Sequence, residues 1–283
     1  MELDTRVLWY GNQRIAYDVR GRGDCTVVLL PGMTLSRRMH DRLTGELTAA
    51  GFRVIRVEPT GFGDSDRPVG YWNYSMSIWA RQVVALLDEL GIERTVLMGT
   101  SAGANITLAT AVHAPDRLMG IIVDSPVLER ATPTCAAVAA VGLLLGTYAA
   151  PLTRTLLRPL AWVPRTYGSI PDLLLTTLCQ EPRRCAEVLQ GIIHGRIMPP
   201  PPVRREIPVK TLVIGERFDP LHVITDAREF ADAVPDGRFL HAITIAELRL
   251  IPGRLAPAIT DFITECWESA SARPPNGFDD DVA

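Results

Sequence analysis

The chain has 283 residues, of which 47% are hydrophobic and 22% are charged, and its formal net charge is −3. This length and composition predict one large α/β domain, or one domain with an insertion, around an ordinary apolar core. The small net charge gives no reason to expect nucleic acid as a partner. The five cysteines are scattered and form no C-x-x-C pair, which indicates reduced thiols in a cytoplasmic protein and no zinc site.

Two segments bear on membranes. The N-terminal stretch MELDTRVLWYGNQ has no basic region followed by an apolar run, so we expect no secretory signal. Residues 136–152, AAVAAVGLLLGTYAAPL, are apolar but fall short of the roughly 20 residues of a membrane span. We therefore expect a buried or lid helix there, and no stable insertion into a membrane.

Strands and helices alternate in the first half of the chain. The N-terminal strands are joined by a Gly-Asn turn, and the later apolar runs are rich in β-branched residues, as is typical of strands buried on both faces. This order implies a mostly parallel central sheet covered by helices. Two strands are expected within 6–20, further strands at 25–32, 52–61, 95–101 and 118–126, and helices at 36–50, 77–91 and 102–114.

The alternation stops after the sixth strand. Residues 127–205 contain helical stretches but no clear core strand, and they end in the stiff, proline-rich return MPPPPVRREIPVK. The polar, acidic tail at 271–283 is expected to be disordered. The sequence thus predicts a core formed by 1–126 and 206–270 around an insertion at 127–205. In the second part of the core, strands are expected at 210–220 and 238–244, and helices at 223–233 and 256–270.

The strongest chemical motif is Gly99-Thr100-Ser101-Ala102-Gly103, of the form G-x-S-x-G. It follows a predicted buried strand and precedes a predicted helix, which is the context of a nucleophilic serine on a strained turn. The oxyanion formed by its attack needs fixed N–H donors. We expect these to be the backbone N–H of Ala102, at a helix N-terminus, and that of Met33, after the VVLLPG strand. The bland alternative for Ser101 is a helix N-cap.

Four motifs in order, LLPG, GFGDSDRP, GTSAG and LVIGERFDP, resemble the α/β-hydrolase superfamily over residues 7–265. The resemblance is to its lidded members, and it implies an α/β-hydrolase fold in which 127–205 is a helical cap over the active site. It also implies that Asp219 is the acid of a catalytic triad. The serine at position 101 argues against the epoxide-hydrolase and dehalogenase branches, whose nucleophile there is an aspartate.

The chain departs from the family where the catalytic histidine is expected. The stretch AITIAELRLIPGRL after the last strand contains no histidine, and Glu247 falls closest to the usual place. Glu247 would act as a base only if burial raised its pKa. His222, three residues after Asp219, is the main alternative, because such a position faces the pocket in lidded relatives. His40 and His194 remain further candidates, while His113 and His241 are expected to lie on the surface and within a strand.

The sequence leaves the reaction open. A serine hydrolase with a displaced base would cleave an ester, lactone or thioester of a small or mid-sized apolar metabolite, because the predicted cap is apolar. An incomplete triad would instead suit a lyase, dehydratase or cyclase, as found in secondary metabolism, or a ligand-binding relative with little turnover. The sequence indicates no metal and no organic cofactor, and it leaves the oligomeric state undetermined.

Overall fold

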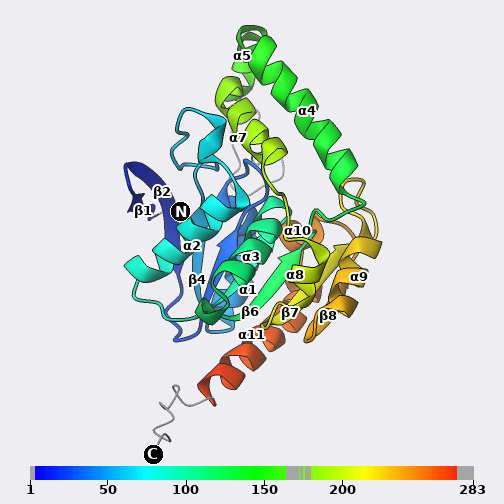
Figure 1. The fold of residues 1–283 in the computed structure, drawn as a ribbon. Helices are drawn as coiled ribbons and strands as arrows, with labels where there is room; N and C mark the ends of the chain where they lie inside the picture. Colours follow the sequence, from blue (N-terminus) through cyan, green and yellow to red (C-terminus); the bar gives the residue numbers. More distant parts are fainter. Residues whose placement is uncertain (1–3, 164–171, 173–174, 176–179, 273–283) are drawn as a thin grey trace, which may run out of the picture.

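The computed structural model describes residues 4–163, 172, 175 and 180–272, and these form an eight-stranded sheet flanked by helices (Figure 1). The strand order is β1-β2-β4-β3-β5-β6-β7-β8, with β2 antiparallel to both of its neighbours and all later pairs parallel. This is the predicted α/β-hydrolase fold. The strands span Arg6–Tyr10 (β1), Gln13–Arg20 (β2), Thr26–Leu30 (β3), Arg53–Glu58 (β4), Thr95–Thr100 (β5), Leu118–Asp124 (β6), Lys210–Glu216 (β7) and Gly237–Ala242 (β8).

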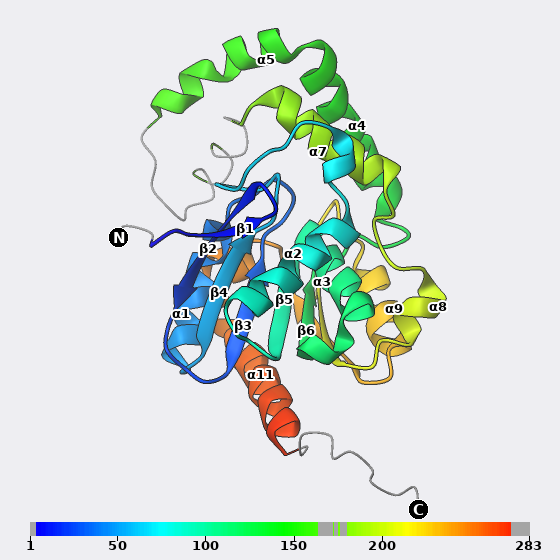
Figure 2. The same cartoon turned by 60° about the vertical axis from the view of Figure 1, so that its left-hand side comes forward.

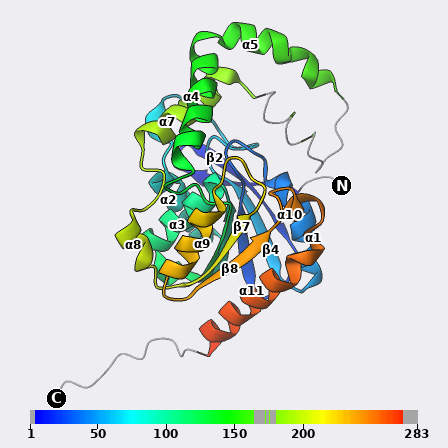
Figure 3. The same cartoon turned by 90° about the vertical axis from the view of Figure 1, so that its right-hand side faces the viewer.

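Helices cover both faces of the sheet, as Figure 3 shows. The helices α2, α3 and α9 pack on one face, and α1 and α11 pack on the other. The core helices span Asp41–Ala49 (α1), Met76–Glu89 (α2), Ala102–His113 (α3), Ile224–Ala233 (α9), Glu247–Leu250 (α10) and Ala256–Ser271 (α11), and short 3-10 turns lie at Arg37–His40, Tyr71–Asn73, Pro115–Arg117 and Pro252–Arg254.

The apolar residues of β3 explain why the sheet has two cores. Val28 and Leu30 belong to the cluster under α2 and α3, whereas Val27 and Leu29 belong to the cluster under α1 and α11. Successive side chains of a strand point to opposite faces, so an unbroken apolar run supplies both layers. Trp79 of α2 is fully buried in the first cluster, and its indole N–H donates to the Thr60 carbonyl at 2.9 Å.

The inserted segment forms a helical cap beyond the carboxyl ends of the parallel strands (Figure 2). It contains α4 (Thr132–Tyr148), α5 (Ala150–Leu157), the 3-10 turn Arg158–Trp162, α7 (Pro182–His194) and α8 (Pro201–Arg205). α4 packs along α7 and turns through 98° into the following helical segment. In the described part of the chain, no single helix is long and apolar enough to cross a membrane, and only the bent pair from Thr132 to Leu160 meets that test jointly.

Three segments outside the central sheet can be compared with the sequence-based expectations. The proline-rich return contains a short helix, α8, which packs near α3. Prolines are tolerated in a first helical turn because its N–H groups have no intrahelical acceptor, so Pro201 and Pro202 begin α8 rather than prevent it. The apolar segment at 136–152, expected to form a buried or lid helix, covers most of α4 and the start of α5, and many of its side chains are exposed. The tail expected to be disordered, 271–283, lies outside the described residues from position 273 onward.

Candidate active site

Ser101 occupies the sharp bend between β5 and α3. Its backbone has a φ of 54° and a ψ of −115°, a combination that non-glycine residues rarely adopt. The Ser101 N–H donates to the Asp124 carbonyl at 2.8 Å, which ties the bend to the end of β6. The serine is half-buried and directly follows β5, which is fully buried, as is the neighbouring strand β6. The strand-turn-helix context predicted for the motif is therefore present.

The two glycines of the motif are required by close backbone contact. A Cβ atom on Gly99 would lie 2.0 Å from the Gly103 carbonyl oxygen. A Cβ atom on Gly103 would lie 2.5 Å from the Leu30 carbonyl oxygen, on the neighbouring strand β3. No side chain fits at such distances, so only glycine lets α3 start this close to the sheet.

The His222 imidazole lies between Ser101 and Asp219. Its Nε2 is 2.9 Å from Ser101 Oγ, and its Nδ1 is 2.7 Å from Asp219 Oδ2. A proton on Nδ1 donates to the carboxylate and leaves Nε2 free to accept the serine proton, which is the arrangement of a catalytic triad. Of the bases that the sequence left open, His222 is the one whose ring contacts the serine.

Asp219 organises the turn that carries this histidine. It lies three residues beyond β7, and its Oδ1 accepts the backbone N–H of Leu221 at 2.7 Å and that of His222 at 3.1 Å. Burial opposes ionisation of the carboxyl, but these hydrogen bonds and the His222 ring outweigh it and lower the Asp219 pKa. The ionised carboxylate thus fixes both the loop and the orientation of the imidazole.

The loop after β3 lies against the nucleophile. A Cβ atom on Gly32 would lie 3.8 Å from the Cβ of Ser101. Within the described residues, neither the Met33 N–H nor the Ala102 N–H has a protein acceptor, so both are available to an incoming oxyanion. Thr34 has a φ of 54°, and the Gln180 side chain donates to its carbonyl at 2.6 Å. A cap residue therefore holds the loop that presents Met33.

A buried cluster of charged groups supports the bend from below. Asp124 Oδ2 accepts Thr100 Oγ1 at 2.7 Å and the Arg249 guanidinium at 2.8 Å. Burial, together with the nearby Asp124, raises the Glu216 pKa to about 9, which favours the neutral acid at pH 7. Burial disfavours ionisation of Asp124 too, but Arg249 overrides it and lowers the Asp124 pKa.

The proposal of Glu247 as base needs correction. Glu247 lies at the start of α10 and is paired with Arg254, and its Oε2 also accepts the Ile243 N–H at 2.8 Å. The hydrogen bond from Arg254 lowers the Glu247 pKa, whereas a base at this position needs a raised one. From the same segment, Arg249 reaches the buried cluster. The usual place of the family histidine is thus occupied by structural ion pairs.

The other histidines lie apart from the serine. His40 is buried, its Nε2 is 3.2 Å from the Leu30 carbonyl, and burial and Arg249 lower its pKa to about 4. His194 is exposed at the end of α7 and contacts the Gln190 carbonyl at 2.8 Å. His113 and His241 are exposed on α3 and β8. His40 is thus neutral and buried, and it packs behind the loop after β3.

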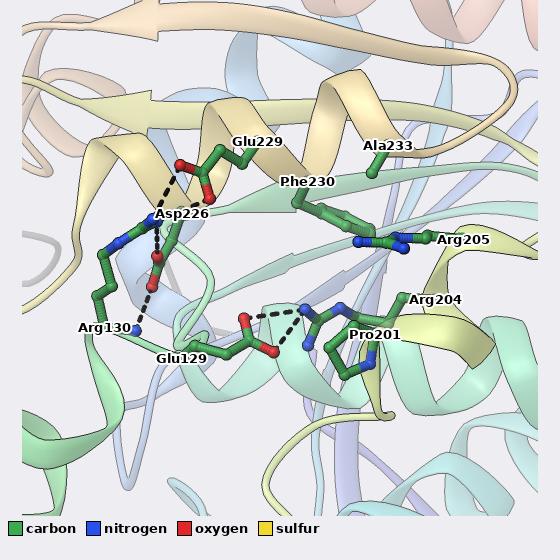
Figure 4. Close-up of a pocket in the computed structure, with 9 residues that line it drawn as sticks. All are labelled: Glu129, Arg130, Pro201, Arg204, Arg205, Asp226, Glu229, Phe230 and Ala233. Atoms are coloured by element: carbon green, nitrogen blue, oxygen red, sulfur yellow. Dashed lines mark hydrogen bonds and ion pairs between the residues drawn. The ribbon is translucent and has the colours of Figure 1, made fainter.

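A cavity of about 300 Å³ lies elsewhere, between the start of the cap segment, α8 and α9 (Figure 4). Five of its charged residues are paired with one another: Arg130 binds Asp226 and Glu229 at 2.8 Å, and Arg204 binds Glu129 at 2.7 Å. The Arg130 pairs join the start of the inserted segment to α9, and the Glu129–Arg204 pair joins it to α8. Among the described residues, no group of three or more His, Cys, Asp or Glu side chains is arranged to hold a metal ion.

Sequence comparisons agree with the fold. Residues 26–171 match the family model described as alpha/beta hydrolase fold. Over 228 residues the chain is 30% identical to the 2-hydroxy-6-oxononadienedioate/2-hydroxy-6-oxononatrienedioate hydrolase of Cupriavidus pinatubonensis, covering 74% of this chain and 77% of that protein. A shorter match, 37% identical over 81 residues, relates it to the 2-hydroxymuconate semialdehyde hydrolase of a Pseudomonas species, covering 29% of this chain and 28% of that protein.

Solved structures share the fold over nearly the whole chain. The enol-lactonase of Burkholderia xenovorans superposes with a TM-score of 0.71 at 20% identity, covering 93% of this chain and 100% of that one. A thermophilic esterase of Thermogutta terrifontis superposes with a TM-score of 0.72 at 20% identity, covering 94% and 99% of the two chains. At such identity the likeness establishes the architecture alone.

The structure also contains contacts that sequence reasoning missed. The Asp124–Arg249 pair links residues 125 positions apart, and the Gln180–Thr34 contact links residues 146 positions apart. No local sequence pattern identifies the partner residue in either pair. One signal was available for the first: a charged residue, Asp124, ends the otherwise apolar run LMGIIVD, and a charge in such a run requires a buried partner.

Proposed function

This chain belongs to the α/β hydrolase family, and we propose that it is a serine-dependent hydrolase of an ester, lactone or thioester of a small or mid-sized apolar metabolite. The observation that carries the proposal is the 2.9 Å contact between His222 Nε2 and Ser101 Oγ, with Asp219 at 2.7 Å behind the ring. A serine hydroxyl becomes a useful nucleophile only beside such a base.

The first half of the reaction follows from these contacts. His222 accepts the Ser101 proton as Oγ attacks the substrate carbonyl, and Asp219 stabilises the imidazolium that forms. The carbonyl oxygen becomes an oxyanion, which the N–H groups of Ala102 and Met33 bind in the tetrahedral intermediate. The N-terminal dipole of α3 adds to this stabilisation.

The second half releases the products. The imidazolium of His222 donates its proton to the departing alcohol, thiol or ring oxygen, and an acyl-enzyme remains on Ser101. His222 then accepts a proton from water, whose oxygen attacks the acyl carbonyl. The bond from the acyl carbon to Ser101 Oγ breaks, His222 returns the proton to Oγ, and the carboxylic acid leaves. Apart from water, each step uses only groups that this chain supplies.

An apolar substrate suits the inserted helices. From Thr132 to Tyr148, α4 carries no charged side chain, and α5 adds one arginine. The names of two relatives also describe hydrolases, one of 2-hydroxy-6-oxononadienedioate and one of an enol-lactone. The alternatives of a lyase, a cyclase or a binding protein depended on an incomplete triad, and the Ser101–His222–Asp219 contacts favour hydrolysis over them.

Covalent labelling tests the proposal. A fluorophosphonate probe should modify the folded protein, and peptide mass spectrometry should locate the adduct on Ser101. The Ser101→Ala variant is the control and should remain unlabelled. Folded protein that the probe leaves unmodified, or that it modifies at another serine, would refute a serine-dependent mechanism at this site.

A further inference from the structure

The outer face of the cap is apolar and exposed. Tyr148 at the end of α4 is 81% exposed, and Trp162 beyond α5 is 82% exposed. Between them on α5, Leu152 and Leu156 are each more than half exposed, and within α4 only Gly146 is buried. We call this surface the cap crest; it comprises Val141, Leu144, Tyr148, Leu152, Leu156 and Trp162.

The crest stands at the point of the molecule farthest from the base of the sheet. In Figures 1, 2 and 3, α5 lies across the top of the molecule and α4 rises to meet it. The 98° bend between the two helical segments places Tyr148 and Leu152 at an outward corner. An exposed apolar patch of this extent on a projecting corner marks an interaction site.

We propose that the cap crest docks on an anionic lipid surface. The described stretch 131–163 contains two arginines, Arg154 and Arg158, and no aspartate or glutamate, whereas the whole chain carries a net charge of −3. Basic side chains beside apolar ones bind acidic headgroups and the upper acyl region together. Tyrosine and tryptophan, the two most exposed members of the crest, favour the headgroup level.

The geometry selects docking over insertion. In the described residues, no single helix meets the length and hydropathy of a membrane span, and the only pair that meets them jointly is sharply bent. α4 also packs along α7, so it has a protein partner on one side and the crest on the other. The helices therefore lie at the surface of a bilayer rather than across it.

A second copy of the chain fits the crest less well. In a two-fold contact the same patch meets itself, and residues 131–163 contain no aspartate or glutamate that could pair with Arg158 of the other copy. The nearby Glu181 is already paired with Arg154 at 2.7 Å within its own chain. Such a contact would therefore leave Arg158 without a counter-charge, whereas an anionic bilayer supplies one.

Vesicle flotation tests the docking independently of catalysis, because it can be run on the Ser101→Ala variant. The protein should float with phosphatidylcholine vesicles that contain about a third phosphatidylglycerol, and much less with phosphatidylcholine alone. The crest variant Leu144→Gln/Tyr148→Gln/Leu152→Gln should lose at least tenfold in apparent affinity. The control variant Trp9→Gln/Ile251→Gln removes similarly exposed apolar side chains from the surface of the α/β domain, outside the cap, and should float like the parent.

Two further measurements separate the contributions. Arg158→Gln should weaken binding to anionic vesicles about fivefold, with no effect on neutral ones. Tryptophan emission should shift to the blue on vesicle binding, and Trp162→Phe should remove that shift. Equal flotation of the crest variant and the parent, equal binding to both vesicle types, or no flotation at all would overturn the proposal. So would light scattering that shows a dimer which the crest variant splits.

Discussion

The imidazole of His222 lies between the side chains of Ser101 and Asp219: its Nε2 is 2.9 Å from Ser101 Oγ, and its Nδ1 is 2.7 Å from Asp219 Oδ2. Both His222 and Asp219 belong to the single loop after β7. Acid and base thus come from positions three residues apart. The segment after β8 therefore contributes no member of the Ser101–His222–Asp219 triad. It supplies Arg249 to the buried cluster and Glu247 to a surface ion pair instead.

Removing the charge of Asp219 should cost most of the activity. In Asp219→Asn the imidazole can keep its place, but the amide can donate to Nδ1 and favour the wrong tautomer, so kcat should fall by about 10⁴-fold. Steady-state kinetics on a p-nitrophenyl ester would measure the loss. Asp226→Asn is the matched control, because Asp226 is a buried carboxylate that binds Arg130 away from the serine. A fall of less than tenfold in Asp219→Asn would be inconsistent with its role.

Glu247 should be dispensable for the reaction. Glu247→Gln removes the Arg254 ion pair at a partly exposed site, which is worth at most about 1 kcal/mol of stability. We expect kcat/KM to stay within about twofold of the parent, since one kcal/mol of folding stability leaves the folded fraction near unity. A hundredfold loss of kcat/KM, with folding intact, would identify Glu247 as the catalytic base.

Glu216 should make the protein less stable as the pH rises. Its pKa is raised to about 9 in the folded state from an ordinary value of 4.5, so between these values the folded state holds a proton that the unfolded state has lost. Stability contributed by this group is complete below about pH 4.5 and declines up to about pH 9, by at most about 1.4 kcal/mol per pH unit.

Glu216→Gln should flatten this decline, because the amide is close in size to the neutral acid but does not titrate. Urea unfolding at pH 6, 7, 8 and 9 would measure the free energy of unfolding of both proteins. Glu46→Gln, on the exposed surface of α1, is the control and should leave the slope unchanged. Parallel curves for Glu216→Gln and the parent would show that Glu216 is ionised when folded.

Two glycine substitutions should shift stability in opposite directions. In Gly103→Ala the new Cβ would meet the backbone oxygens of Leu30 and Pro31 at 2.5 and 2.6 Å, so we expect a loss of about 3 kcal/mol. In Gly45→Ala, within α1, nothing lies within 4 Å of the new Cβ, and helix propensity should add about 0.5 to 1 kcal/mol. Urea unfolding gives both values, and a neutral Gly103→Ala would mean that α3 starts farther from β3.

Much of the fold was predictable because its signals are local. The apolar run of β3 and the glycine pair around Ser101 each encode burial or close contact within a few residues. Asp219 followed from the family resemblance. The alternation of strands and helices predicted a mostly parallel sheet, whereas the spatial order of its strands came from the structure.

The base was not predictable to the same degree, because its place depends on the path of a loop. Sequence spacing put His222 three residues after Asp219, but several turns satisfy that spacing. The carboxylate of Asp219 selects one of them by accepting two backbone N–H groups, and this turn directs the ring toward Ser101. Arg249 and Gln180 escaped prediction because their partners lie over 100 positions away in the sequence.

The central claim is that His222 is the proton acceptor for Ser101, and its most direct test is kcat for a p-nitrophenyl ester in His222→Ala. We expect a fall of at least about 10³-fold, with unfolding by urea unchanged within 1 to 2 kcal/mol. His241→Ala, which removes an exposed histidine from β8, should retain the parent value. A folded His222→Ala protein whose kcat stays within tenfold of the parent would contradict the account.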